Sequence, residues 1–313
     1  MKIVFLEPLA YSFETIDMAC EDLRKQGHEV VIYPDKRPEL NLERAQGADI
    51  LVQTDMPMDA TFLAACPELK MLAVAIVGLD HIDMEYCDSH GIAVTNAAGY
   101  STEAVAELTV GMILALYRNM AENDRITRNW QGKAMLPGLE LKGKTVGLIG
   151  MGNIGRRTAE LLCVFGCKIL AWNRSFRVVE GVQFVEKDTL LRESDIVSMH
   201  LALSDETVDF LNYKDFQQMK RSAVFINTAR GCIVNNTDLA RALREGLIAG
   251  AALDVYADEP PLFQGLPPMQ ADNPLLHVPH TLLLPHIGFG TVEAKKLRFK
   301  TVLDNINAYL SKA

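Results

Sequence analysis

The chain has 313 residues, 49% of them hydrophobic and 23% charged, which is the balance of an ordinary globular protein. Its length is enough for about two domains. The formal net charge is −9 at pH 7, so the overall field attracts neither nucleic acid nor an anionic membrane, and we expect neither as a partner. An anionic small molecule would have to be held by local positive groups.

The cysteines and the N-terminus indicate the compartment. The six cysteines are scattered, and no Cys-x-x-Cys pair occurs, so we expect buried thiols in a reducing compartment and no metal site. The opening segment, MKIVFLEP, reads as a strand and lacks the apolar core of a signal peptide. The longest apolar run, 105–117, contains Glu107 and is too short to span a bilayer. These features predict a cytoplasmic protein.

The first third of the chain alternates between two patterns. A helical pattern covers 12–26 and ends at Gly27, and further helical patterns separate short apolar runs. We predict strands at 2–6, 29–33, 50–53, 71–75 and 92–95. This alternation is typical of a parallel sheet with helices on both faces. A long helix is then expected from about 101 to 119, with Ser101 and Thr102 as possible N-caps.

A second strand-turn-helix series begins in mid-chain. Its expected strands are 145–149, 168–172, 183–185, 196–199, 223–227, 249–254 and 281–284, and a final helix is expected over about 292–310. We therefore predict an α/β protein with two doubly wound parallel-sheet domains. The expected layout is discontinuous, with residues 1–98 plus 291–313 in one domain and 99–290 in the other. Ligands bind in such sheets beyond the carboxyl ends of the strands.

A glycine pattern lies at the start of the second series. Gly150, Gly152 and Gly155 form Gly-x-Gly-x-x-Gly between an expected strand and an expected helix. The first glycine permits a tight turn, the second lets a pyrophosphate approach the backbone, and the third lets the helix pack closely on the strand. The pattern alone is weak, and an incidental glycine turn is the alternative. The flanking strand, helix and following strand favour dinucleotide binding.

The end of the next strand indicates which dinucleotide. Sites specific for NAD usually place a carboxylate there for the ribose 2′-hydroxyl, whereas this chain has Asn173, followed by Arg174, Ser175 and, further on, Arg177. A neutral amide beside arginine and serine would accept a 2′-phosphate. We therefore favour NADP over NAD. The alternative is that Asn173 binds the ribose hydroxyl of NAD and the arginines are solvated.

Three further motifs follow in order: NTARG at 227–231, ALDVYADEP at 252–260 and LPHIG at 284–288. Together with VGLDHID at 77–83 and VAEL at 105–108, they resemble the D-isomer-specific 2-hydroxyacid dehydrogenase family. That family includes glyoxylate and hydroxypyruvate reductases, phosphoglycerate dehydrogenases and D-lactate dehydrogenases. The resemblance covers nearly the whole chain, and it implies a Rossmann cofactor domain inserted in a flavodoxin-like substrate domain.

The resemblance implies roles for three residues. Arg230 would bind the carboxylate and carbonyl of a 2-oxo acid, for which a planar guanidinium offers a fork of donors. His286 would give or take the proton as hydride moves, and Glu259 would orient it and favour its imidazolium form. Each residue alone has a plainer explanation, as an ion-pair partner, a loop charge or a structural histidine. All three follow expected strands at one sheet edge, which favours the catalytic interpretation.

Further contacts are implied by the same resemblance. Asp254 corresponds to an aspartate near the nicotinamide carboxamide, and the backbone at Val77 and Gly78 to a loop that holds the substrate carboxylate. Additional cofactor contacts are implied at Asn153, Ile154, Leu201, Thr228, Ala229 and Gly288.

The distribution of basic residues bears on the substrate class. Phosphoglycerate-specific members of the family that the chain resembles place arginines for the phosphate in the first domain. The matching segments here, 51–57 and 71–78, contain no Lys or Arg, and a phosphate there would be without a charge partner. We therefore expect a small anionic 2-oxo or 2-hydroxy acid of the glyoxylate, hydroxypyruvate or pyruvate type. D-3-phosphoglycerate dehydrogenase is the nearest alternative, and a dinucleotide-sensing, corepressor-like interaction protein is the alternative from another class. The 101–119 helix is apolar on more than one face and could be buried within one subunit. The resemblance implies a homodimer instead, because the matching helix of the family contributes to a two-fold dimer.

Overall fold

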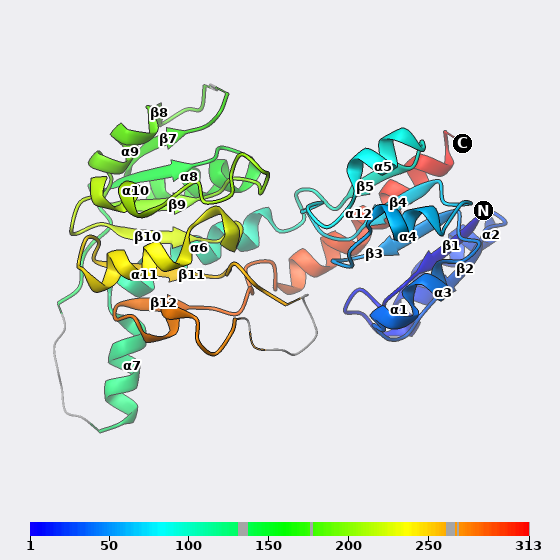
Figure 1. Cartoon of the computed structure of the whole chain (residues 1–313), viewed down its shortest axis with the longest axis horizontal. Coiled ribbons are helices and arrows are strands. Elements are labelled where there is room, and N and C mark those ends of the chain that lie inside the picture. The colour runs from blue at the N-terminus through cyan, green and yellow to red at the C-terminus, as the bar shows by residue number, and fades with distance from the viewer. Residues whose placement is uncertain (131–136, 176–177, 261–266, 268, 313) are drawn as a thin grey trace. The chain divides into compact units, whose positions relative to one another are not determined.

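The structure is a computed structural model of the chain (Figure 1) and describes residues 1–130, 137–175, 178–260, 267 and 269–312. The chain divides into two compact units, and each is described by itself. Unit 1 consists of Met1–Tyr100 and Val292–Ala313, and unit 2 of Ser101–Thr291.

Unit 1 is built on a parallel sheet. Its strands, in the order β2-β1-β3-β4-β5, all pair in parallel. This is the doubly wound order of flavodoxin-like folds. The middle strands are fully buried apolar runs, as expected where helices cover both faces of a parallel sheet. The strands are β1 (Lys2–Phe5), β2 (Glu29–Ile32), β3 (Ile50–Gln53), β4 (Met71–Val74) and β5 (Ala93–Asn96).

The helices of unit 1 include the last one of the chain. Helix α12 (Val292–Leu310) packs Phe299, Val302 and Ile306 against buried residues of β1 and β3. The C-terminal segment therefore completes the core of the N-terminal unit. The other helices are α1 (Phe13–Ala19), α2 (Glu21–Lys25), η1 (Pro38–Leu40), α3 (Asn41–Ala45), α4 (Ala60–Ala64) and α5 (Met84–Ser89).

Two expected helices differ from the structure. The helix expected over 12–26 is divided at Cys20, where the guanidinium of Arg24 donates to the carbonyl oxygen of Asp17 at 2.9 Å and pairs with its carboxylate. The side chain of Arg24 in α2 thus hydrogen-bonds a backbone carbonyl of α1 close to the division at Cys20. The helix expected over 101–119 is α6 (Thr102–Tyr117), which is followed by Asn119 in the left-handed conformation at φ 50°. Asparagine tolerates this conformation better than most residues, and α7 (Met120–Arg128) starts directly after it.

Unit 2 is built on a second parallel sheet, whose described strands have the order β12-β11-β10-β9-β6-β7-β8. Counted from β6, this is the Rossmann order 3-2-1-4-5-6 extended by one strand. Expected and observed strands agree to within about two residues at each end. The strands are β6 (Thr145–Ile149), β7 (Lys168–Trp172), β8 (Val182–Phe184), β9 (Ile196–Met199), β10 (Val224–Asn227), β11 (Gly250–Leu253) and β12 (Thr281–Leu283).

Helices cover both faces of this sheet, as the two apolar clusters of unit 2 demonstrate. Residues of α6 and α8 (Asn153–Val164) form one cluster with Val146 and Leu148 of β6. Residues of three further helices form the other cluster. These are α9 (Lys187–Glu193), α10 (Tyr213–Gln218) and α11 (Asn236–Arg244), with the short turns η2 (Gly231–Ile233) and η3 (Pro274–His277).

The apolar character of α6 is explained inside unit 2. Eight of its residues are buried, among them Val105, Met112 and Ile113, and the helix packs on α8, β10, β11 and β12. No helix in the described parts of the chain is both long enough and apolar enough to cross a membrane.

The glycine turn after β6 gives a test of this packing. Gly150 has φ 102°, and a Cβ there would lie 2.6 Å from the backbone of His200. We expect Gly150→Ala to lower the free energy of unfolding by about 2–4 kcal/mol, because left-handed backbone strain and overpacking add. Urea unfolding followed by tryptophan fluorescence measures it, since both tryptophans, Trp130 and Trp172, lie in unit 2.

The matched control is Gly152→Ala two residues away, where a Cβ would meet nothing within 4 Å. It should cost less than about 1 kcal/mol. Equal losses in the two variants would contradict the packing described for Gly150.

Candidate active site

Five potential site residues lie at one edge of the unit 2 sheet. Because β6, β9, β10, β11 and β12 run parallel, their carboxyl ends meet at the same edge. Gly150, His200, Arg230, Asp254 and His286 each follow one of these strands within a few residues. In open α/β sheets this edge is where ligands bind.

The glycine turn has the geometry of a dinucleotide cradle. A Cβ on Gly155 would lie 2.1 Å from the carbonyl oxygen of Gly150, so this close approach of helix and strand requires glycine. Above Gly152 there is open space. Gly152 is the N-cap of α8 and has no side-chain cap, which leaves N–H groups at the start of this helix for a ligand. Asn153 and Ile154 are the first helical residues.

The residues at the end of β7 bond partly to each other. Asn173 accepts a hydrogen bond from the backbone N–H of Met151 at 3.2 Å and donates one to the carbonyl oxygen of Ser175 at 2.8 Å. The amide thereby joins the glycine turn to the end of β7. The guanidinium of Arg174 lies 3.0 Å from the carboxylate of Glu206. Arg177 lies outside the described residues.

The histidine and the glutamate form a dyad. His286 Nδ1 lies 2.6 Å from Glu259 Oε2, and the two side chains are only 20% and 18% exposed. The other carboxylate oxygen of Glu259 accepts the backbone N–H of Tyr256. With both oxygens engaged, the carboxylate holds the imidazole by Nδ1 and leaves Nε2 for a reacting group.

Asp254 supports the turn that carries the histidine. Its carboxylate accepts the backbone N–H of Ile287 at 2.8 Å and that of Gly288 at 2.7 Å. His286 itself has a left-handed backbone, at φ 55°. Burial raises the pKa of Asp254, while the two N–H donors and the nearby His286 act in the opposite direction. The sequence motif indicated Asp254 as a cofactor contact but did not predict that its carboxylate accepts these two hydrogen bonds from the turn.

The turn that carries Arg230 is fixed by a buried amide. Asn227 accepts the N–H of Ala229 at 3.0 Å and donates to the carbonyl oxygen of Arg230 at 3.0 Å. A Cβ on Gly231 would lie 1.8 Å from the carbonyl carbon of Tyr256, so this turn packs directly on the turn that carries Glu259. Asn227 and Gly231 are thus structural residues of the NTARG motif.

The remaining expected contacts line the same edge. Thr228 Oγ1 lies 3.1 Å from Thr109 Oγ1 on α6, which ties the β10 turn to this helix. Leu201 is half-buried after β9. Gly288 lies against Asp254, because a Cβ there would be 2.9 Å from Oδ2.

His200 does not form a second acid–base group. Burial lowers its pKa to about 4, and its Nε2 lies 2.9 Å from Ser198 Oγ. The imidazole is therefore neutral near pH 7. Its backbone carbonyl packs against Gly150, which agrees with a structural role.

Val77 and Gly78 belong to unit 1, where they follow β4. Val77 is exposed, and its carbonyl oxygen accepts a 2.7 Å hydrogen bond from Asn96 Nδ2 at the end of β5. This hydrogen bond joins the loop after β4 to the end of β5 at the carbonyl group of Val77.

A cation that sequence reasoning missed lies at the carboxyl edge of the unit 1 sheet. Lys36 comes from the segment after β2, outside the two segments in which a phosphate partner was sought. Its ammonium pairs with the carboxylate of Asp55 and lies 3.6 Å from that of Glu7. All three side chains are largely buried. Two carboxylates therefore already face this positive charge.

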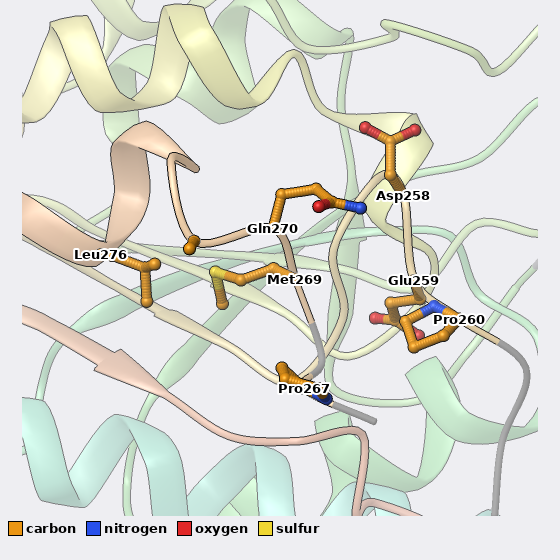
Figure 2. A pocket seen from close by; sticks show the side chains of 8 residues that line it. Asp258, Glu259, Pro260, Pro267, Met269, Gln270 and Leu276 are labelled. Atoms are coloured by element: carbon orange, nitrogen blue, oxygen red, sulfur yellow. The ribbon is translucent and has the colours of Figure 1, made fainter. Parts of the chain in front are cut away.

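Figure 2 shows a cavity of about 610 Å³ beside the dyad, with Asp258 and Glu259 on one side and Met269 and Leu276 on the other. The described lining contains no Lys, Arg or His, so it offers no counter-charge for a carboxylate substrate. The lining residues are Asp258, Glu259, Pro260, Pro267, Met269, Gln270, Ala271 and Leu276. Across the described residues, no group of three or more His, Cys, Asp or Glu side chains is placed to hold a metal ion.

Comparison with known proteins identifies this arrangement. Residues 110–288 match the family model for the D-isomer specific 2-hydroxyacid dehydrogenase, NAD binding domain. The chain is 42% identical to a glyoxylate reductase of Thermofilum pendens over 295 residues, which covers 90% of this chain and 84% of the relative. It is 36% identical to a hydroxypyruvate reductase of Thermotoga maritima, with 79% of each chain covered.

Solved structures agree in fold. An acyclic imino acid reductase in complex with NADPH and D-Arg superposes with a TM-score of 0.89 at 27% identity and covers 100% of this chain and 98% of its own. From its sequence, its two parallel sheets and these matches, the chain belongs to the D-isomer specific 2-hydroxyacid dehydrogenase family and is an oxidoreductase of that family.

Proposed function

We propose that the chain reduces small, unphosphorylated 2-oxo acids of the glyoxylate, hydroxypyruvate or pyruvate type to D-2-hydroxy acids, with NADPH preferred to NADH. The single observation that carries the proposal is the 2.6 Å contact between His286 Nδ1 and Glu259 Oε2. The names of the two relatives, glyoxylate reductase and hydroxypyruvate reductase, support the substrate class. A non-enzymatic dinucleotide sensor would leave this dyad without a chemical role.

The proposed chemistry is a coupled transfer of hydride and proton. The nicotinamide, when bound, supplies the hydride to the carbonyl carbon of the 2-oxo acid. His286, as imidazolium, gives the proton on Nε2 to the carbonyl oxygen and becomes neutral. Glu259 holds Nδ1 and favours the charged form before the transfer. In the oxidative direction, neutral His286 takes the hydroxyl proton through the same atom.

We assign the binding of the two partners to the two units. Unit 2 would be the cofactor domain and unit 1 the substrate domain. Arg230 would bind the carboxylate and carbonyl of the acid through its planar fork of donors, and the backbone at Val77 and Gly78 would hold the carboxylate. Pyrophosphate would lie over Gly152 at the start of α8, where the N–H groups and the open space fit it.

The remaining cofactor contacts are proposed at the same sheet edge. Asn173, Arg174 and Ser175 would bind the ribose and its 2′-phosphate, and Asp254 would lie near the nicotinamide. The other proposed contacts are Gly150, Asn153, Ile154, Gly155, Leu201, Thr228, Ala229 and Gly288.

The pairing of Lys36 with two carboxylates supports an unphosphorylated substrate. Its ammonium already faces the carboxylates of Glu7 and Asp55. A substrate phosphate near them would meet two negative charges for one positive charge, which is unfavourable in a partly desolvated site. This arrangement favours a short 2-oxo acid over 3-phosphoglycerate.

We further propose a homodimer. Large apolar side chains stay exposed at both ends of α7 and at Leu139, with Trp130 95% exposed and Met120 and Leu139 about half exposed, and exposed apolar side chains contribute to many interfaces. Light scattering should give twice the 34.7 kDa mass of the chain. Trp130→Lys should shift the protein toward the monomer, whereas Val164→Lys, an exposed apolar position on α8, should not. A monomeric parent protein would contradict the proposal.

The dyad predicts a characteristic pH dependence. Reduction needs His286 protonated and oxidation needs it neutral, so reduction should fall and oxidation should rise as pH increases. Glu259→Gln removes the negative charge that favours imidazolium. The reductive profile should then move to lower pH, as measured by NADPH oxidation with glyoxylate across the pH range. An unmoved profile would show that the dyad does not control the proton.

His286→Ala tests the proton donor itself. Turnover should fall by roughly 10²–10⁴-fold, the usual effect of a positioned acid. Dinucleotide binding measured by calorimetry should stay close to that of the parent, because the imidazole is not proposed to hold the cofactor. Near-normal turnover would remove His286 from the mechanism.

The proposed cofactor preference depends on Arg174. Arg174→Ala should weaken NADPH binding by about 10-fold, the loss of a charge-assisted contact at an exposed site, and should change NADH binding much less. Dissociation constants for both cofactors measure this difference. Equal changes for NADPH and NADH would show that Arg174 does not bind the 2′-phosphate.

A further inference from the structure

Glu206 lies beside the proposed phosphate-binding arginine. The carboxylate Oε2 is 3.0 Å from Nη1 of Arg174, although the two residues are 32 positions apart in the chain. Arg174 lies two residues beyond β7, and Glu206 lies in the turn that follows β9. Several other exposed arginine pairs of unit 2, such as Arg125 with Glu122, join residues three or four apart on one helix, whereas Arg157 of α8 reaches Glu103 of α6. Helical spacing therefore does not explain the contact between Arg174 and Glu206.

The turn that carries Glu206 is fixed by its own hydrogen bonds. Thr207 Oγ1 accepts the backbone N–H of Ser204 at 2.7 Å and donates to the carbonyl oxygen of Ala202 at 2.9 Å. The backbone N–H of Asp209 donates to the carbonyl oxygen of Cys232 at 2.9 Å. The position of Glu206 is therefore set by the backbone of the turn.

An aromatic contact places this turn against the end of β7. The rings of Phe210 and Trp172 are 5.0 Å apart and tilted by 42°, a favourable geometry for an aromatic pair. Trp172 is the last residue of β7, two positions before Arg174. Packing thus brings the carboxylate of Glu206 to the arginine from a separate loop.

We propose that Glu206 is a specificity-determining residue that weakens the binding of NADPH relative to NADH. The inference rests on the proposed function, in which Arg174 binds the 2′-phosphate. This phosphate carries about −1.5 to −2 charges at pH 7. It must compete with Glu206 for the guanidinium and is repelled by the carboxylate, whereas the 2′-hydroxyl of NADH carries no such charge.

The size of the effect follows from exposure. The side chains of Arg174 and Glu206 are 83% and 74% exposed, so water and salt screen their interaction. Exposed ion pairs change an equilibrium by a factor of about 1.4–5. Glu206 should therefore adjust the cofactor preference that Arg174 creates, without reversing it.

The direct test is Glu206→Gln, which keeps the size of the side chain and removes its charge. Calorimetry should show a dissociation constant for NADPH that is about 2- to 5-fold lower than in the parent, with that for NADH changed less than about 1.5-fold. The same preference should appear with 2′-phospho-AMP against AMP, which needs no turnover. The gain should shrink as salt is raised from about 0.1 M to about 1 M, where the Debye length falls to about 3 Å.

Asp205→Asn is the matched control, because it removes the same charge one residue away, in the same exposed turn. It should leave the ratio of the two dissociation constants within about 1.5-fold of the parent, since a general change in surface charge is screened. An Asp205→Asn effect as large as that of Glu206→Gln would reduce the proposal to net charge and overturn it.

Other outcomes separate this inference from the proposed function. If Glu206→Gln weakens NADH binding, the carboxylate binds the ribose hydroxyls and the inference is wrong. If Arg174→Ala weakens NADPH selectively but Glu206→Gln leaves the cofactor ratio unchanged, the inference alone fails. If Arg174→Ala changes the dissociation constants of NADPH and NADH equally, Arg174 does not bind the 2′-phosphate. The proposed cofactor preference and this inference then both fail.

Discussion

The catalytic geometry of unit 2 depends on a buried carboxylate. Asp254 is only 1% exposed, and both of its oxygens accept backbone N–H groups from the turn after β12. These two bonds hold the segment that begins at His286, whose backbone adopts a left-handed conformation that a non-glycine residue rarely takes without support. Without the carboxylate, the backbone N–H groups of Ile287 and of the buried Gly288 would lack their acceptor.

The burial of Asp254 makes the stability of the fold depend on pH. Burial raises the pKa of Asp254 above its ordinary value. A raised carboxyl pKa means that the folded state binds a proton more readily than the unfolded chain, so this group makes folding less favourable as pH rises through that interval and above it. The buried carboxylate therefore lowers the stability of the fold above that interval, as is common where geometry serves function.

Local sequence patterns predicted the elements well but not the contacts between them. The strands are recognisable because each is a short apolar run between turn residues, and the dyad because both members belong to ordered motifs. The division of the 12–26 helix at Cys20 was not predicted, since the contact of Arg24 with Asp17 is not encoded in apolar periodicity. Lys36 was missed because it reaches the sheet edge from a loop that no motif marks. Glu206 was missed for the same reason.

Local charges determine where anions can bind to this protein. Its net charge is −9, and its family acts on anionic substrates with an anionic cofactor. The overall field opposes both ligands, so each must be met by positive groups placed at short range. Three basic side chains at the sheet edges have a carboxylate nearby: Lys36 has Asp55, Arg174 has Glu206 and His286 has Glu259. A nearby carboxylate lowers the affinity of a cation for anions in general and makes binding depend on how well a ligand displaces it or fits beside it. For the proposed ligands, the acidic residues of the sheet edges would contribute discrimination between anions, and the basic residues would contribute affinity.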